Sequence, residues 1–130
     1  MILGIGNDLC EVARISEAIE RQGQNFLDRL FTPLEQALAA KTRDAAAFYA
    51  GRFAAKEACL KALGTGITAR VRWTDCQVSH HRTGQLALEI SGGALRRLKR
   101  LAGRGRGFAA HVSITYDGEY AAAFVIFEGT

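Results

Sequence analysis

Residues Gly51 to Gly66 read Gly-Arg-Phe-Ala-Ala-Lys-Glu-Ala-Cys-Leu-Lys-Ala-Leu-Gly-Thr-Gly, and the rest of the chain is organised around this stretch. Its alanines, leucines, lysines and glutamate favour a helix, and the closing glycines supply the backbone freedom that a helix needs in order to end. Extended backwards to an N-cap at Asp44, the stretch predicts a helix of roughly 30 Å. A helix of that length would cross a small domain from side to side.

One face of this predicted helix carries an aromatic ring and two charges. Phe53, Glu57 and Lys61 are spaced four apart and therefore share a face. Taken alone, Glu57 and Lys61 are most simply a solvated ion pair one turn apart. The short side chains around them favour a functional interpretation, because a ligand or another backbone could approach the helix closely. The neighbouring stripe is expected to be core: Ala55, Ala58, Cys59, Ala62 and Leu63.

Length and composition indicate one compact domain over residues 1–130. The hydrophobic fraction is 48% with a single proline, which is typical of a globular protein. The N-terminus has no basic segment before an apolar run, and the longest apolar run, Tyr120 to Phe127, is too short to span a bilayer. We therefore predict a cytoplasmic protein without a membrane partner.

Cysteine spacing and net charge limit the kinds of site and partner that the protein can have. Cys10, Cys59 and Cys76 are odd in number and lack the paired spacings of a zinc site or disulfide framework, so we expect buried, reduced thiols. Lysine and arginine total 17 against 13 acidic residues, a net charge of +4. This excess favours an anionic partner, whether a phosphorylated ligand, an acidic protein or nucleic acid.

The N-terminal part of the chain begins with a strand. Residues 2–9 are mostly apolar, and Gly4 and Gly6 would permit close approach by a backbone or ligand. Asp8 stands at the strand's end, where it could cap the next helix or bind a metal ion. That helix places Arg14 and Arg21 together on a face away from its apolar stripe. There they could have a function or could equally be solvated charges. A later capping signal, Thr32-Pro33-Leu34-Glu35, predicts a helix to about Lys41.

The C-terminal half alternates in hydropathy and predicts strands. Residues 72–78 and 85–90 form one expected hairpin, residues 92–102 a basic helix, and residues 109–128 a second hairpin that turns at Asp117-Gly118. The last strand, residues 120–127, is apolar on both faces, so it should be central in a sheet or covered by another subunit. The predicted class is α+β, with the long central helix packed on a small, mainly antiparallel sheet.

Two carboxylates could create a site if the central helix crosses the sheet near the end of the first strand. Asp8 and Glu57 would then suit Mg²⁺, which takes one or two protein carboxylates and completes its shell with waters and substrate phosphates. Lys61, one turn beyond Glu57, would reach a phosphate oxygen. Sequence separation alone does not bring these residues together.

Three motifs together resemble the bacterial holo-acyl-carrier-protein synthases, which are 4′-phosphopantetheinyl transferases. They are Gly4-Ile-Gly-Asn-Asp8 with Arg14, the Gly51 to Gly66 block, and His111-Val-Ser-Ile-Thr. The resemblance runs nearly end to end and is most specific in the central block. It implies Mg²⁺-dependent transfer of 4′-phosphopantetheine from coenzyme A to a serine of apo-acyl carrier protein, with release of adenosine 3′,5′-bisphosphate. Mn²⁺ is an alternative metal, and the carrier could serve fatty-acid or polyketide synthesis.

The resemblance also implies roles for individual residues. Asp8 and Glu57 match the metal-binding acids, and Glu57 is the candidate acceptor of the serine proton, with Lys61 as the rival if it is deprotonated. Lys61 would stabilise charge on the leaving group and, with Gly64 and Tyr116, bind the coenzyme. Asp8, Glu57 and Lys61 are therefore the candidate catalytic residues.

The partners follow from the same resemblance. Arg14 matches the position that receives the acidic carrier protein, and Arg21 would extend that surface. The resemblance also implies a homotrimer, because the small members of the family bind coenzyme A between neighbouring chains of a trimer. Two other interpretations stay open from the residues alone. One is a nucleic-acid binder that uses the basic residues 96–106, but no recognition motif is present and we expect no nucleic-acid partner. The other is a coenzyme-binding module without catalysis.

One position departs from the family pattern. The family's last motif commonly ends Ser-x-Ser/Thr-His, whereas Ser113-Ile114-Thr115 is followed here by Tyr116. Tyrosine can donate one hydrogen bond but carries no imidazolium charge at neutral pH. We therefore predict weaker or differently arranged coenzyme binding with the reaction retained.

Overall fold

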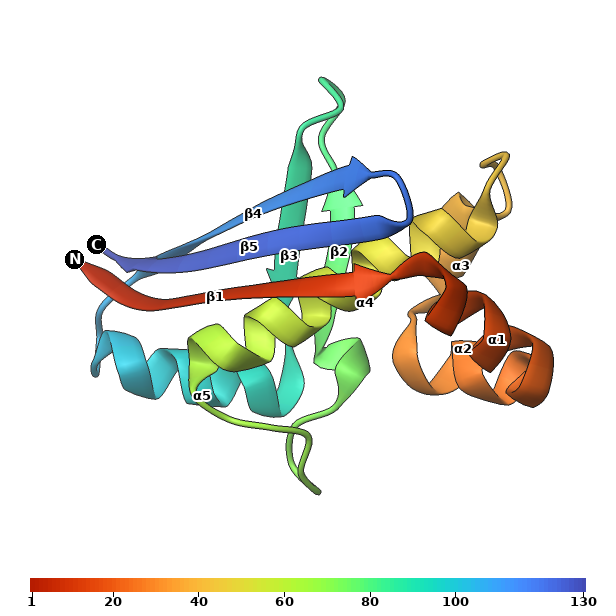
Figure 1. Cartoon of the computed structure of the whole chain (residues 1–130). Coiled ribbons are helices and arrows are strands. Elements are labelled where there is room, and N and C mark those ends of the chain that lie inside the picture. Colours follow the sequence, from red (N-terminus) through yellow and green to blue (C-terminus); the bar gives the residue numbers. More distant parts are fainter.

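The computed structural model describes residues 1–130. Along the chain its elements are β1 (Ile2–Glu11), α1 (Val12–Gln22), α2 (Gln24–Leu30), α3 (Pro33–Ala39), α4 (Ala45–Leu63), the 3-10 turn η1 (Trp73–Asp75), β2 (Cys76–His80), β3 (Leu86–Ile90), α5 (Gly92–Ala102), β4 (Phe108–Asp117) and β5 (Tyr120–Gly129). Figure 1 shows α4 running beneath a sheet of β1, β5 and β4, with α1 to α3 gathered at one end and α5 at the other. The expected α+β class is confirmed.

The last strand is central, as its apolar sequence predicts. The three-stranded sheet has the antiparallel order β1-β5-β4, and β2 and β3 form a separate antiparallel hairpin. Gly6 pairs with Val125 and Asp8 with Ala123. Because directly opposed residues project from the same face of a sheet, Asp8 shares the face of the buried Val125 and Ala123, the face that α4 covers.

Helix α4 lies close to β1 because two strand residues have no side chain. A Cβ on Gly4 would overlap the Ala62 carbonyl, and a Cβ on Gly6 would overlap the Ala58 carbonyl. The helix begins at Asp44, whose carboxylate accepts the Ala47 N–H at 3.0 Å. This crossing brings the C-terminal half of α4 beside the end of β1.

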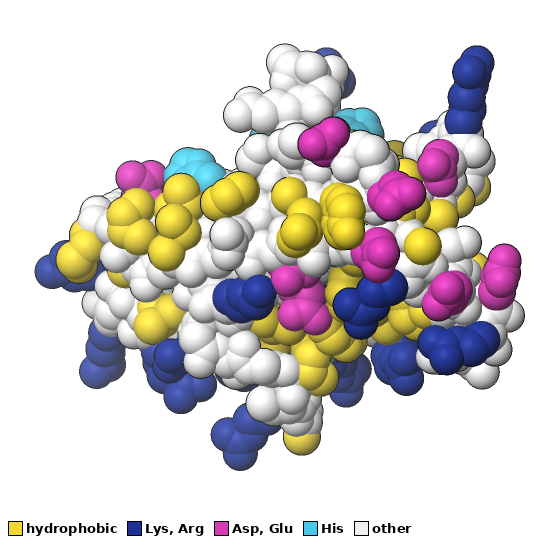
Figure 2. Space-filling model, in the orientation of Figure 1, with side chains coloured by type: hydrophobic (Ala, Val, Ile, Leu, Met, Phe, Trp, Pro, Cys, Tyr) yellow, Lys and Arg dark blue, Asp and Glu magenta, His cyan; other side chains and the backbone are white.

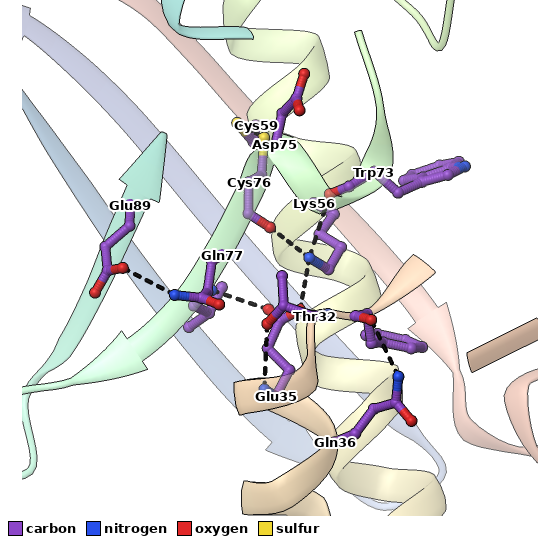
Figure 3. Close-up of polar contacts among 12 residues, drawn as sticks. Thr32, Glu35, Gln36, Lys56, Cys59, Trp73, Asp75, Cys76, Gln77 and Glu89 are labelled. Carbon is purple, nitrogen blue, oxygen red and sulfur yellow. Dashed lines mark hydrogen bonds and ion pairs between the residues drawn. The ribbon is translucent and has the colours of Figure 1, made fainter. Parts of the chain in front are cut away.

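A charged pair is buried between α3 and α4. Both side chains are fully buried, and Lys56 Nζ lies 2.8 Å from Glu35 Oε1. The same carboxylate accepts the N–H groups of Thr32 and Val78, each at 2.9 Å. Glu35 is therefore the predicted capping residue of α3 and also a link to β2 (Figure 3).

The lysine of this pair is anchored on its other side by backbone. Lys56 Nζ donates to the Trp73 carbonyl at 3.3 Å and to the Cys76 carbonyl. These bonds, drawn in Figure 3, tie α4 to η1 and to the start of β2. A buried charge is tolerated only when it is paired and hydrogen-bonded, and both ions of this pair are.

Three sequence expectations are wrong in detail. Residues 73–75 form a 3-10 turn in place of the start of a strand, because the Asp75 carboxylate accepts the N–H groups of Arg72 at 3.1 Å and Ala94 at 3.3 Å. Strand β1 continues to Glu11, so Asp8 lies inside the strand and not at its end, and the alternative that Asp8 caps α1 is excluded because Glu11 is the N-cap. Helix α3 ends at Ala39, short of Lys41.

The cysteines are free and buried, as expected.

Helix α4 ends at Gly64, which adopts the left-handed conformation with φ 72°. None of the helices combines the length and the apolar character needed to cross a bilayer.

Candidate active site

Lys61 bridges α4 and the C-terminal half of β1. Its Nζ lies 3.1 Å from Asp8 Oδ1 and donates to the Asn7 carbonyl at 3.0 Å. The Asp8 side chain is 18% exposed and that of Lys61 is 53% exposed, so the carboxylate is sheltered while the ammonium reaches solvent. The two residues are 53 positions apart, and the crossing of α4 over Gly4 and Gly6 is what brings them into contact.

Glu57 lies one turn before Lys61 on α4 and is close enough to interact with Asp8. Burial and, next, the Asp8 charge raise the pKa of Glu57, while the Lys61 charge partly offsets both. A carboxylate in such surroundings is stabilised by a proton or by an added cation. The three residues thus form a compact cluster of two acids and one ammonium.

Two hollows meet at Asp8. The first, which we call the α1 hollow, has a volume of about 420 Å³ and is lined by both Asp8 and Glu57. The second, the β5 hollow, has a volume of about 400 Å³ and is lined by Asp8, Lys61 and Phe124 among others. Figure 2 shows acidic side chains flanked by basic ones near the end of β1. Asp8 therefore forms part of the wall of both hollows.

The α1 hollow also contains the predicted partner-binding arginines. Arg14 and Arg21 line it from α1, on the same helix face as Glu17 and Ala18. Phe53 lines it from α4, as its spacing from Glu57 predicts. Positive charge therefore lies beside the two carboxylates at this opening.

Sequence reasoning did not assign several residues of this hollow to the site, among them Cys10 and Phe26. Cys10 lies on the same strand face as Asp8, and its spacing of two could have indicated this. Burial, followed by the Asp8 charge, raises the pKa of Cys10 to about 11, so its thiol stays protonated at neutral pH. Phe26 enters from α2, and nothing in the local sequence pattern signals its role.

The structure separates two expected coenzyme-binding residues from the cluster. Gly64 follows Lys61 by one turn but lines neither hollow. Tyr116 packs against Gly51, where an added Cβ would collide with its hydroxyl group. Gly51 precedes Lys61 by ten helical residues, which corresponds to about 15 Å along α4. Within one chain, Tyr116 therefore lies apart from Lys61.

A buried arginine beside this contact was also missed. Arg52 is 6% exposed, and its guanidinium carbon lies 4.0 Å from the centre of the Phe48 ring. Its Nε has no hydrogen-bond partner. The neighbouring aromatic residues mask such a position in the sequence, because they make the segment look like ordinary core.

The acidic residues fit some metals better than others. No three His, Cys, Asp or Glu side chains come together to form a closed metal cage. Asp8 and Glu57 supply two carboxylates and no nitrogen or sulfur ligand. This donor set suits Mg²⁺, which keeps waters and substrate phosphates in its shell, better than a structural Zn²⁺ site.

Fold and site together define the class of protein. Residues 4–125 match the family model of the 4′-phosphopantetheinyl transferase superfamily, and the chain belongs to that superfamily, within the group of holo-acyl-carrier-protein synthases. It is 48% identical over 128 residues to the holo-[acyl-carrier-protein] synthase of Phenylobacterium zucineum, covering 98% of this chain and 93% of that protein. It is 50% identical over 126 residues to that of Azorhizobium caulinodans, covering 97% and 93%.

Solved structures with the same fold bear the same name. The holo-[acyl-carrier-protein] synthase of Neisseria meningitidis has a TM-score of 0.85 at 30% identity, covering 98% of this chain and 99% of that one. That of Helicobacter pylori, solved in complex with coenzyme A, has a TM-score of 0.80 at 28% identity, covering 95% and 99%. The expectation that the chain is an enzyme of this family is confirmed.

Proposed function

We propose that the chain transfers 4′-phosphopantetheine from coenzyme A to a serine of apo-acyl carrier protein, depends on Mg²⁺ and releases adenosine 3′,5′-bisphosphate. The names of its relatives and the coenzyme in the Helicobacter pylori structure support this choice of substrates. The observation that carries the assignment is the convergence of Glu57 and Lys61 on Asp8, between two hollows. Two carboxylates and an ammonium group at that point suit phosphoryl transfer, which relies on positioning and on neutralising phosphate charge.

In the proposed reaction the serine oxygen forms a bond to the β-phosphorus of coenzyme A. The bond from that phosphorus to the bridging oxygen breaks, and its electron pair leaves with adenosine 3′,5′-bisphosphate. Glu57, which lines the α1 hollow, accepts the serine proton. Lys61 already pairs with a carboxylate, so we assign it the role of a cation that stabilises the leaving phosphate.

Asp8 and Glu57 are the residues that would hold Mg²⁺, with Mn²⁺ as the alternative. When bound, the ion would neutralise charge on the pyrophosphate. The Asp8 charge already raises the pKa of Glu57, and a cation beside the two carboxylates would stabilise the ionised form of Glu57.

Arg14 and Arg21 are the proposed contacts of the carrier protein. They line the α1 hollow beside Glu57, so a serine delivered there arrives near its base. A basic surface of this kind accelerates encounter with an acidic partner, and the effect weakens as salt rises.

We further propose a homotrimer in which neighbouring chains cover the outer face of the three-stranded sheet. Ile5, Leu9 and Phe124 are 63%, 65% and 52% exposed on the face away from α4, and Figure 2 shows apolar side chains in a row over β1 and β5. Exposed apolar patches of this kind mark association surfaces. Phe124 also lines the β5 hollow, so a neighbour on this face would complete a coenzyme site between chains and could contribute its Tyr116.

The assembly is tested by light scattering coupled to size-exclusion chromatography. We expect a mass three times the 14.1 kDa of the chain, and dissociation when Phe124→Glu places a charge in the contact. Arg104→Glu, an exposed residue outside this face, is the control. A wild-type monomer would overturn the assembly and the coenzyme site between chains, but not the roles proposed for Asp8, Glu57 and Lys61.

The function is tested by intact mass of apo-acyl carrier protein after incubation with the protein, coenzyme A and Mg²⁺. We expect a gain of one phosphopantetheine group that EDTA abolishes and that Glu57→Gln nearly abolishes while the circular dichroism spectrum is unchanged. An equal gain in EDTA would remove the metal from the reaction. No gain with several carriers would favour a coenzyme-binding module without catalysis.

A further inference from the structure

A groove with a strong positive charge lies between α5 and the segment that follows α4. Its volume is about 590 Å³, and we call it the basic groove after the five cations that line it: Arg70, Arg96, Arg97, Lys99 and Arg100. Two threonines line it as well, Val71 is its single hydrophobic residue, and no acidic residue lines it. It shares no lining residue with the α1 hollow or the β5 hollow.

The five cations have no acidic partner. The ion pairs of the structure are Lys56 with Glu35, Lys61 with Asp8, and His111 with Glu128. Lys99 and Arg100 lie in the last turn of α5, where cations interact favourably with the helix dipole, and this alone could explain those two. Arg70 comes from a different segment and has no such explanation. Like charges brought together from two segments repel each other unless an anion lies between them.

The two walls of the groove are fixed to each other. The backbone of Gly93 in α5 lies so close to that of Arg70 that an added Cβ would overlap the Arg70 carbonyl. The Thr68 hydroxyl accepts the N–H groups of Arg70 at 3.1 Å and Val71 at 3.2 Å, which shapes the facing segment. The cations of the groove are therefore held on a preformed frame, which lowers the entropy lost when a ligand binds.

One arginine joins the groove to the end of α4. Arg97 Nε donates to the Leu63 carbonyl at 2.9 Å, across 34 positions of sequence. This bond satisfies a carbonyl in the last turn of α4 and fixes the plane of the guanidinium group, while its remaining N–H groups stay available to a ligand. An arginine fixed in this way presents a fork that matches two phosphate oxygens.

We propose that the basic groove is a site, distinct from that of coenzyme A, for a small compound that carries two or more linked phosphate groups. Arginine forks and threonine hydroxyls are donors suited to phosphate oxygens, and several phosphates in one compact ligand would offset several of the five charges. No aromatic side chain lines the groove, so it offers no platform on which nucleic-acid bases could stack. Figure 2 shows basic side chains along the edge of the molecule where α5 lies in Figure 1.

The test uses inorganic tripolyphosphate and isothermal titration calorimetry on the full chain. We expect saturable binding at a stoichiometry of one per chain, weakened by added salt. The double variant Arg96→Gln/Arg100→Gln should weaken it about tenfold or more, because it removes two charged donors to phosphate oxygens. The control Arg104→Gln/Arg106→Gln makes the same charge change on exposed residues outside the groove and should alter affinity by less than about threefold.

Three results would overturn the proposal. Equal weakening by both double variants would show attraction to net charge alone, with no site. Displacement of tripolyphosphate by coenzyme A would make the groove part of the coenzyme site. Tighter binding of a single-stranded oligonucleotide, lost in Arg96→Gln/Arg100→Gln, would make it a nucleic-acid surface. Because the readout is direct binding, failure here leaves the transferase proposal unaffected.

Discussion

The carbonyl oxygen of Ala58 occupies the space that a side chain on Gly6 would need. This contact lets α4 lie directly on β1, and it positions the helix turn that contains Glu57 and Lys61. The close approach of α4 to β1 therefore determines the position of the site as well as the fold.

Gly6→Ala should lower the free energy of unfolding by about 2–3 kcal/mol, because an added methyl group meets backbone that can move only by separating α4 from β1. Urea denaturation followed by circular dichroism measures this. Gly66→Ala is the matched control, since its added Cβ meets nothing within 4 Å. Equal stability of the two variants would contradict the packing argument.

Lys56→Met should destabilise the protein by about 3–5 kcal/mol, because it leaves the Glu35 carboxylate buried without its cation. Adding Glu35→Gln in the same chain should recover part of that loss, which a double-mutant cycle in urea would measure. Lys41→Met, at an exposed position after α3, should change stability by less than about 0.5 kcal/mol. A recovery of zero would show that the two charges do not interact energetically.

The contrast between Lys56 and Glu57 shows what sequence can and cannot reveal. Local signals correctly predict where α3 and α4 begin and where α4 ends, because the Thr32 capping box, the Asp44 cap and the Gly64 terminus each depend on neighbouring residues. Which of two adjacent charged residues on α4 turns inward depends on α3 and β2, and these lie far away in sequence.

The same limit applies to the site and to η1. Spacing alone joined Glu57 to Lys61, whereas the link to Asp8 came only from the family resemblance. Residues 73–75 look like strand, but the Asp75 carboxylate accepts the backbone N–H of Ala94 in α5. A partner 19 positions away leaves no trace in the local pattern.

Glu57→Gln should lower turnover by about 10²-fold or more and, in metal-free protein, raise the melting temperature at neutral pH. The pKa of Glu57 is raised on folding, so the native state binds its proton more tightly than the unfolded state does. This stability is present at low pH and is lost as pH rises through the folded pKa. The amide variant lacks that loss, and the difference in melting temperature should therefore grow between pH 4 and pH 7.

Mg²⁺ supplies the control for this experiment. It should raise the melting temperature of the wild type and have a smaller effect on Glu57→Gln, because one of the two proposed ligands is then neutral. An identical response of both proteins to Mg²⁺ would exclude Glu57 as a ligand.

Tyr116→His should lower the KM for coenzyme A, since imidazole adds a partly charged donor where the family commonly has histidine. Tyr116→Phe separates the two contributions, because it removes the hydroxyl without adding charge. Steady-state rates with varied coenzyme A measure both. A KM that is unchanged or higher in Tyr116→His would refute the prediction.

Iodoacetamide at pH 8 should leave the folded protein unmodified over minutes and add three groups after unfolding in guanidinium. Cys10, Cys59 and Cys76 are buried, and burial raises the pKa of Cys10 to about 11. The reactive thiolate is therefore scarce as well as inaccessible. Rapid modification of one thiol, located by peptide mass spectrometry, would identify a cysteine that the fold does not protect.

The shared wall at Asp8 has a kinetic consequence. The α1 hollow and the β5 hollow share Asp8 but differ in most of their lining, with Arg14 and Arg21 in one and Lys61 and Phe124 in the other, so the carrier and the coenzyme can occupy separate places at the same time. We infer direct transfer within a ternary complex, with no phosphopantetheinylated form of the enzyme between two half-reactions. Initial rates measured against both substrates should then give intersecting reciprocal plots, whereas parallel lines would require a covalent intermediate that this wall does not need.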